Sequence, residues 1–223
     1  MAEQDGGVLG RVQVQALAAD GPAVLRGCDL EAADMAGLDL SGWRFERCSL
    51  KAAKLTQAVL EGAVFHGCRG GFANLAAARL ADTVMQSCDF NNASFAEAVL
   101  TGARLEGCKL TGADLTKAGT MGLVLVETLL ADARLRGVSL RRAVLVGVDF
   151  SGADLGGCDF RDAVFERCSL RDAHVTGARF EGADLRGADL GGLKMADAGK
   201  FKGAVVSRRQ AADLVAQLGL LVR

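Results

Sequence analysis

A period of five residues is the feature that most constrains how this chain can fold. From Leu25 to Met195, every fifth residue is large and apolar at 33 of 35 positions, with no change of phase. Only Gly70 and Thr120 depart from the rule. This period matches neither the 3.6-residue turn of an α-helix nor the two-residue repeat of a long strand. It indicates very short strands separated by regular corners.

A second set of small residues follows the same period. The residue two positions before each large one is usually Ala, and all seven cysteines fall in this set. The residue two positions after is often Gly, which adopts corner conformations that other residues resist. Each pentapeptide therefore predicts one inward–outward–inward strand step and one corner, and successive units would wind into a solenoid.

A twenty-residue recurrence predicts how many sides each coil has. Five cysteines lie twenty residues apart, and a neighbouring column holds only Ala from Ala33 to Ala173. With four pentapeptides in a coil, residues twenty apart stack directly, whereas a coil of fifteen would scatter both sets. The sequence therefore predicts a four-sided coil, repeated about eight and a half times. The evenly spaced cysteines are Cys28, Cys48, Cys68, Cys88 and Cys108.

Units such as "ADLTK", "ADLGG" and "ADLRG" resemble those of the pentapeptide-repeat family. The resemblance covers roughly residues 23–197. It implies an all-β fold, the right-handed quadrilateral parallel β-helix. We expect three parts: an N-terminal lead-in and cap over residues 1–22, the β-helix over 23–197, and a C-terminal helix and tail over 198–223 that cap the solenoid and pair two copies.

The two ends lose the five-residue register. At the N-terminus, "RVQVQAL" alternates apolar and polar residues, which predicts a strand. At the C-terminus, "SRRQAADLVAQLG" predicts a helix. Ser207 and Gln210 fit a capping box, and Gly219 fits a C-terminal stop. Both ends of a solenoid need such caps because they expose unpaired strands.

Gly70 and Thr120 each leave one inward position without a large apolar side chain. An insertion of five or ten residues would preserve the phase of the repeat. We therefore expect a local bulge or a short excursion of the chain at both places.

Catalytic and metal-binding chemistry is not predicted. The two histidines, His66 and His174, belong to different faces about five coils apart, too far to act together. The cysteines form a line inside an apolar core and do not converge as tetrahedral ligands would. We expect cysteines that pack as small hydrophobes, no cofactor, no metal, no catalytic residue and no enzymatic activity.

Charge and hydropathy exclude further classes of protein. The formal net charge is −1, so direct nucleic-acid binding is not expected. No run of eighteen apolar residues suggests a membrane span, and the N-terminus lacks the layout of a signal peptide. An odd number of cysteines without an export signal favours reduced thiols in the cytoplasm.

Outward positions are the place to look for function. Two neighbouring outward columns contain valines that would form one apolar patch: Val124, Val126, Val144 and Val146. Two interpretations remain open. Exposed valines suit strands because β-branched residues favour them. Alternatively, the patch binds a partner or a second copy.

A closer resemblance concerns the C-terminal end. The segments "ADLRGADLGGLK" and "SRRQAADLVAQLGLLV" look like the tail of the quinolone-resistance (Qnr) pentapeptide proteins and their mycobacterial relatives. It implies a homodimer paired through the terminal helix. It also implies an acidic rod that mimics DNA and binds DNA gyrase or topoisomerase IV, protecting or inhibiting it. The dimer contacts would be Leu214, Val215, Leu218, Leu220 and Leu221.

Outward carboxylates would serve as phosphate mimics: Asp29, Asp89, Asp149 and Asp189 in one column, with Asp114 and Asp154 in another. The charge balance departs from that pattern, because 27 acidic residues face 26 basic ones and basic residues interrupt both columns. The alternative is that these carboxylates solubilise the wall or bind corner amides. The protein would then be a scaffold or adaptor that binds another partner without DNA mimicry.

Overall fold

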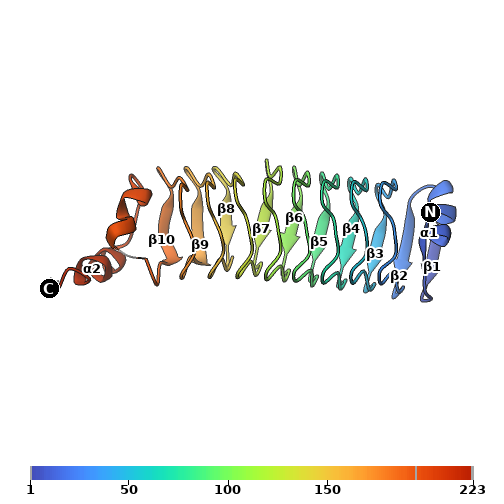
Figure 1. Ribbon diagram of the computed structural model, residues 1–223, viewed down its shortest axis with the longest axis horizontal. Helices are drawn as coiled ribbons and strands as arrows, with labels where there is room; N and C mark the ends of the chain where they lie inside the picture. The colour runs from blue at the N-terminus through green and yellow to red at the C-terminus, as the bar shows by residue number, and fades with distance from the viewer. Residues whose placement is uncertain (1, 194, 222–223) are drawn as a thin grey trace.

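In the computed structural model, residues 2–193 and 195–221 are described, and most of them form one long parallel β-helix. The chain winds through about nine turns along the rod. Strand and bridge pairing divides each turn into four short walls. The N- and C-termini lie at opposite ends of the rod (Figure 1). This confirms the fold class expected from the five-residue and twenty-residue periods.

One wall is a ten-stranded parallel sheet in which strands follow chain order. Residues twenty apart pair across it, so Phe45 lies between Leu25 and Phe65. The other three walls are held by single bridges with the same spacing. The strands are β1 (Ala2–Asp5), β2 (Ala23–Arg26), β3 (Arg44–Glu46), β4 (Val64–His66), β5 (Val84–Gln86), β6 (Arg104–Glu106), β7 (Val124–Val126), β8 (Val144–Val146), β9 (Val164–Ser169) and β10 (Asp184–Asp189).

The corners explain the glycine content. The residue two after each inward residue commonly has a positive φ, near 60° in most coils. Glycine takes this left-handed conformation without a steric penalty, whereas a residue with a Cβ is strained there. The other corner residues are Ala or polar, with one exception. Phe72 has φ 60° and is 64% exposed.

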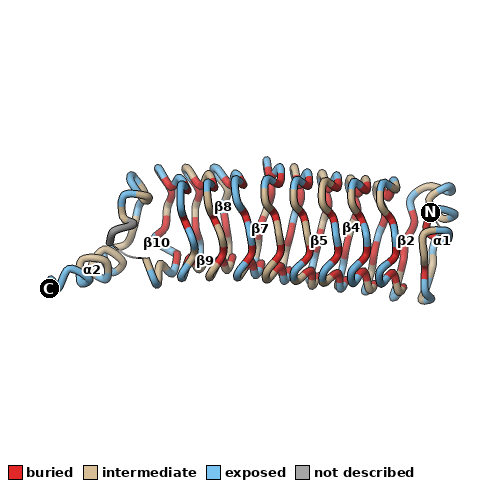
Figure 2. Tube along the Cα trace, viewed as in Figure 1, coloured by how far each residue is buried: buried red, intermediate tan, exposed pale blue. Residues whose placement is uncertain are grey.

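The core is the ladder that the period predicts, and Figure 2 shows buried residues recurring in every coil. Aromatic rings stack along the axis, as in the Phe45–Phe65 pair, whose centroids are 4.7 Å apart. All seven cysteines are buried free thiols. The Sγ of Cys68 donates to the Phe45 carbonyl, 3.2 Å away, and the hydroxyl of Thr128 makes the equivalent bond to Leu105. A cysteine in this column therefore combines apolar packing with a weak donor.

The N-terminal cap differs from the prediction. The segment "RVQVQAL" lies in a helix, α1 (Arg11–Ala19), and not in a strand. Val14 is fully buried and Leu17 and Ala18 pack against the core, whereas Val12 is exposed. Residues i, i+3 and i+4 form one helical face, so burial against the first coil overrides the local alternation.

The C-terminal end contains the 3₁₀-helix η1 (Met195–Phe201) and the helix α2 (Arg208–Ala216). The capping box is confirmed: the Gln210 amide donates to the Ser207 hydroxyl at 3.2 Å, and the Ser207 amide donates to Gln210 Oε1 at 2.6 Å. Gly219 has φ 76° just beyond the last turn, as a stop residue should. The side chain of Met195, the last predicted member of the ladder, lies outside the described residues.

No bulge or excursion of the chain occurs at Gly70 or Thr120, so that prediction is wrong. At Gly70 the ring of Phe90, from the next coil, fills the vacant position, and an added Cβ would overlap that ring. The backbone ladder continues there, since the Gly70 amide donates to the Asp89 carbonyl at 2.7 Å. Thr120 also keeps the register of its coil, but the wall beside it opens, as described below.

Candidate protein-binding surfaces

All six carboxylates predicted as phosphate mimics serve first as turn formers. Each accepts a hydrogen bond from the backbone amide two residues further along, as Asp29 does from Glu31 at 2.9 Å and Asp149 from Ser151 at 2.9 Å. The same bond is made by Asp89, Asp114, Asp154 and Asp189. These aspartates hold the start of each corner, and one carboxylate oxygen of each remains for a further interaction.

Three of the six use that oxygen in an ion pair with an arginine of a neighbouring coil. The pairs are Asp114 with Arg134 at 2.9 Å, Asp154 with Arg136 at 2.8 Å and Asp189 with Arg171 at 2.9 Å. The Gly191 amide, together with Arg171, holds the pKa of Asp189 below its usual range. These three carboxylates are locally neutralised.

The remaining three are Asp29, Asp89 and Asp149, and no ion pair is found for them within the described ranges. They share one wall of the solenoid at intervals of three coils, roughly 14 Å each. Arg69 and Lys109 belong to the same column and pair by backbone bridges with Asp89. The wall therefore alternates in charge and is not a continuous acidic stripe.

The four predicted valines come together on the wall that carries β7 and β8, where Val126 pairs with Val146. Val144 is 54% exposed and the other three are half-buried. One further apolar side chain widens this surface, Met121 at 77% exposure. We call the four valines the valine patch.

Beside the valine patch, the wall between two coils is open. In the neighbouring coils, Gly119 bridges to Val99 and Ser139 bridges to Asp159, yet no bridge joins Gly119 to Ser139 in the described part of the chain. The backbone bond from the amide of Val144 to the coil below is likewise missing there, although Val124 and Val164 make theirs. The two coils are spread apart between β7 and β8 along the upper edge of Figure 1. We call this opening the seam.

Thr120 explains the seam. It occupies the inward position that Leu100 fills in the coil before and Leu140 in the coil after. Its hydroxyl must find an acceptor and takes the Ser139 carbonyl at 2.6 Å, the group that the backbone amide would otherwise bind. The hollow left in the wall has a volume of about 960 Å³. Its lining includes Leu123, Leu140 and two arginines, Arg141 and Arg142.

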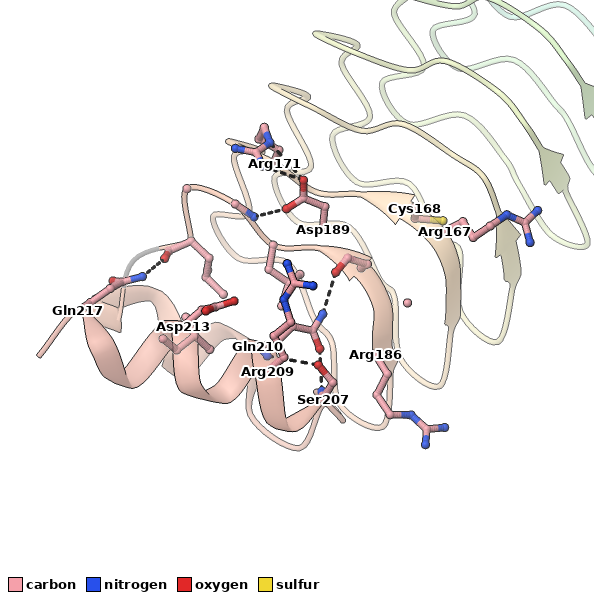
Figure 3. Close-up of a pocket in the computed structure, with 17 residues that line it drawn as sticks. Arg167, Cys168, Arg171, Arg186, Asp189, Ser207, Arg209, Gln210, Asp213 and Gln217 are labelled. Carbon is pink, nitrogen blue, oxygen red and sulfur yellow. Dashed lines mark hydrogen bonds and ion pairs between the residues drawn. The ribbon is translucent and has the colours of Figure 1, made fainter. Parts of the chain in front are cut away.

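A second hollow, of about 740 Å³, lies between β10 and α2. Figure 3 shows Gln210 reaching from α2 across the open edge of the last coil. Its side-chain amide donates to the carbonyls of Leu185 at 2.8 Å and Ala188 at 2.7 Å. Phe201 also covers this end, stacked on Phe180 with a centroid separation of 4.5 Å. The C-terminal cap is therefore attached through the hydrogen bonds of Gln210 and the stacked ring of Phe201.

The apolar side chains of α2 and the tail remain partly or largely exposed, although Leu214 also lines the hollow between β10 and α2. Leu214 and Val215 are only half-buried, and no residue of α2 is buried. Leu218, Leu220 and Leu221 are 57%, 56% and 86% exposed. The five residues predicted as dimer contacts are thus accessible in the single chain.

The cysteines and histidines, which could support catalysis or metal binding, are not gathered into one site. Burial raises the pKa of Cys158 to about 12 and that of Cys28 to about 11, so these thiols resist ionisation. His66 lies on β4, and His174 bridges to Asp154 on another wall. In the described ranges, no three His, Cys, Asp or Glu side chains are grouped as a metal site would need. None of the described helices has the length and apolarity needed to cross a bilayer.

Family models for pentapeptide repeats match this sequence. The model of the pentapeptide repeat region matches residues 38–115, and that of pentapeptide repeats (8 copies) matches 23–51, 125–162 and 163–198. The chain belongs to the pentapeptide-repeat family. Residues 116–124, which include Thr120, lie between the matched stretches. A comparison with curated proteins finds no significant match.

Solved structures of QnrB1, described as a plasmid-mediated fluoroquinolone resistance protein, are similar to most or all of this chain. One trypsin-treated QnrB1 variant covers 99% of this chain and 100% of its own, with a TM-score of 0.76 and 22% identity. Full-length QnrB1 covers 86% of this chain and 100% of its own, with a TM-score of 0.59 and 24% identity. At this level of identity the likeness concerns the fold.

Sequence reasoning located the walls, the valines and the terminal helix but missed the seam. Thr120 was visible as a break in the ladder, and it was the available signal. The sequence did not show that Thr120 would separate two neighbouring coils while the path of the chain within its own coil stays regular.

Proposed function

We propose that this protein binds other proteins and acts as a Qnr-type DNA mimic that protects DNA gyrase or topoisomerase IV from fluoroquinolones. The observation that carries the proposal is the likeness to a QnrB1 structure over 99% of this chain. The unpaired carboxylates of Asp29, Asp89 and Asp149 are the best candidates for contact with an enzyme surface that normally holds phosphates.

The decisive experiment is a gyrase supercoiling assay with and without a fluoroquinolone. The wild-type protein should restore supercoiling in the presence of the drug at submicromolar to micromolar concentration. No effect at micromolar concentration, and none on topoisomerase IV, would reject this function.

The Asx-type turns allow a clean test of the carboxylates. Replacing Asp29, Asp89 and Asp149 together by Asn keeps the Oδ1 acceptor of each turn and removes three charges. This variant should lose at least about tenfold in protection. The matched control is Asp114→Asn with Asp154→Asn, where arginines already neutralise the carboxylates. Equal losses in both variants would argue against mimicry by the unpaired carboxylates.

Dimerisation through the C-terminal helix is the second part of the proposal. Leu218 and Leu221 are exposed, so Leu218→Glu with Leu221→Glu should preserve the β-helix and yield monomers. Mass in solution measures the result, and deletion of residues 207–223 serves as the complete removal. A variant that stays dimeric after this deletion would place the contact elsewhere.

A scaffold or adaptor without DNA mimicry is the alternative function. It is favoured by the alternation of charge on the walls and by the neutralisation of three of the six carboxylates. In that case gyrase assays show no effect, and partner capture depends on the apolar surface. Charging Val124 and Val144 should then abolish capture while leaving the mass of the protein in solution unchanged.

A further inference from the structure

At the seam, backbone amides that are bonded at the junction before and at the junction after have no inter-coil partner within the described ranges. Thr120 and Val144 carry amides whose bonds to the adjacent coil are missing among the described residues, while the equivalent amides of Leu100 and Val124 are bonded. On the opposite walls the same two coils stay bridged, through Leu129 and Asp149 among others. The opening is therefore a wedge with a fixed base, and its polar edges remain available for binding.

The walls of the wedge are apolar and its lips are exposed. Leu123 and Leu140 line the hollow, so it reaches to the edge of the core. Met121 stands at one lip and Val144 at the other, where the valine patch begins. An apolar side chain that entered here would replace the Leu that the ladder lacks at Thr120 and would bury apolar surface on both sides.

The charge around the wedge is positive. Arg141 and Arg142 both line it, and the partner that the structure gives them is Asp162, shared at 3.7 and 3.8 Å. Two guanidinium groups that share one distant carboxylate can form ion pairs with further carboxylates, because no close ion pair has to be broken first.

We propose that the seam is a docking site for an acidic segment of a partner protein, which inserts one apolar side chain between the two coils. Arg141 and Arg142 pair with carboxylates that flank the inserted residue, and the valine patch extends the contact. One side of the seam, with Thr120 and Met121, lies in residues 116–124, which the family models leave unmatched, and the other side lies in the matched stretch 125–162. The proposal does not depend on gyrase binding.

The opening itself is tested by hydrogen exchange of single amides. The amides of Ser139 and Val144 should exchange at least about 100-fold faster than those of Gly119 and Val124, their bonded counterparts one coil earlier. Thr120→Leu restores the ladder and should slow the two fast amides to the rate of the controls. Equal rates in the wild-type protein would overturn the proposal at its first step.

The occupant is tested with three labelled twelve-residue peptides measured by fluorescence anisotropy. One holds a central Leu between glutamates, one replaces that Leu by Ser, and one replaces the glutamates by lysines. Only the first should bind the wild-type protein. Thr120→Leu should weaken binding at least about tenfold, as should Arg141→Gln combined with Arg142→Gln. Thr56→Leu, at a half-buried corner about three coils from the seam, is the control for the change of residue type and should bind like the wild type.

Met121→Glu keeps the test valid if Thr120→Leu fails to fold, because Met121 is exposed and its replacement should only repel the acidic peptide. Three outcomes would overturn the proposal: no binding of the acidic peptide at millimolar concentration, equal binding of the acidic and basic peptides, or unchanged binding by Met121→Glu. A wild-type oligomer that becomes a monomer in the Thr120→Leu variant would also overturn the proposal, because a second copy of this chain would then occupy the seam.

Discussion

Gly70 and Thr120 are the two positions where the apolar ladder fails, and the structure responds to them in opposite ways. At Gly70 a ring from the next coil fills the space and the wall stays closed. At Thr120 the wall opens into a hollow of about 960 Å³. Both residues lack a large apolar side chain, so missing volume alone does not open a solenoid.

The difference is the hydroxyl. Gly70 has no side chain that needs space or a hydrogen-bond partner, so the Phe90 ring can occupy its place while the backbone hydrogen bonds remain. Thr120 brings a donor into the core and bonds the Ser139 carbonyl, which displaces the backbone bond between coils. A hydroxyl in this ladder therefore competes with backbone amides for the carbonyl oxygens of the next coil. A position without a side chain is instead filled by a neighbouring side chain.

The largest expected effect concerns the filled site. Gly70→Leu would place its side chain inside the Phe90 ring and should lower the free energy of unfolding by about 3 kcal/mol or more. Phe90→Leu in the same chain would restore the plain repeat and should recover most of that loss. Denaturant unfolding of the two single variants and the double variant measures the coupling. Additive losses would show that Phe90 does not fill this position.

The open site should respond in the opposite direction. Thr120→Leu buries an apolar side chain and frees the Ser139 carbonyl for the backbone amide. The free energy of unfolding should rise by about 1–3 kcal/mol. Denaturant unfolding is the measurement, with Thr56→Leu, at a half-buried corner, as the control. A decrease would mean that the wedge cannot close around the added side chain.

A smaller effect is expected at the corner beside Gly70. Phe72 is a bulky residue with φ 60° and a largely exposed ring. Phe72→Asn should stabilise the protein by about 1 kcal/mol, since Asn tolerates the left-handed conformation. Ala77→Asn, at the next corner, is the matched control and should change stability less. Destabilisation by Phe72→Asn would show that the ring makes contacts that outweigh the backbone strain.

The smallest effect concerns the coil above the seam. A hydrogen bond from Arg161 lowers the pKa of Asp159 to about 2, so the folded state favours the carboxylate. This contribution is present above the unfolded pKa near 4 and is lost as the pH falls to about 2. Because the pair lies near the surface, it should amount to less than about 1 kcal/mol. Unfolding curves from pH 5 to 2 should converge for wild type and Asp159→Asn, and parallel curves would contradict this.

Sequence reasoning succeeded wherever the repeat fixed the environment of a residue. Cys108 could be placed beside Cys88 because twenty residues make one coil, and the role of Ser207 followed from local capping chemistry. It failed at α1, where burial of Val14 decided the structure against the local pattern. The column placed Arg134 one coil from Asp114, but that the two would pair, and which carboxylates would stay unpaired, depended on the side-chain geometry of neighbouring coils.

By itself the sequence determined the four-sided coil, the core ladder and the buried thiols, because each of these depends on regular spacing along the chain. It also determined the C-terminal helix, because helix capping is local chemistry. Only the tertiary structure decided that Phe90 closes one break and that Thr120 opens the other. The physical reason is that the walls are held by hydrogen bonds between neighbouring coils, whereas the bonds within a coil close only its corners. The consequence of a break is therefore set by what the next coil can offer, an aromatic ring in one case and a single carbonyl oxygen in the other.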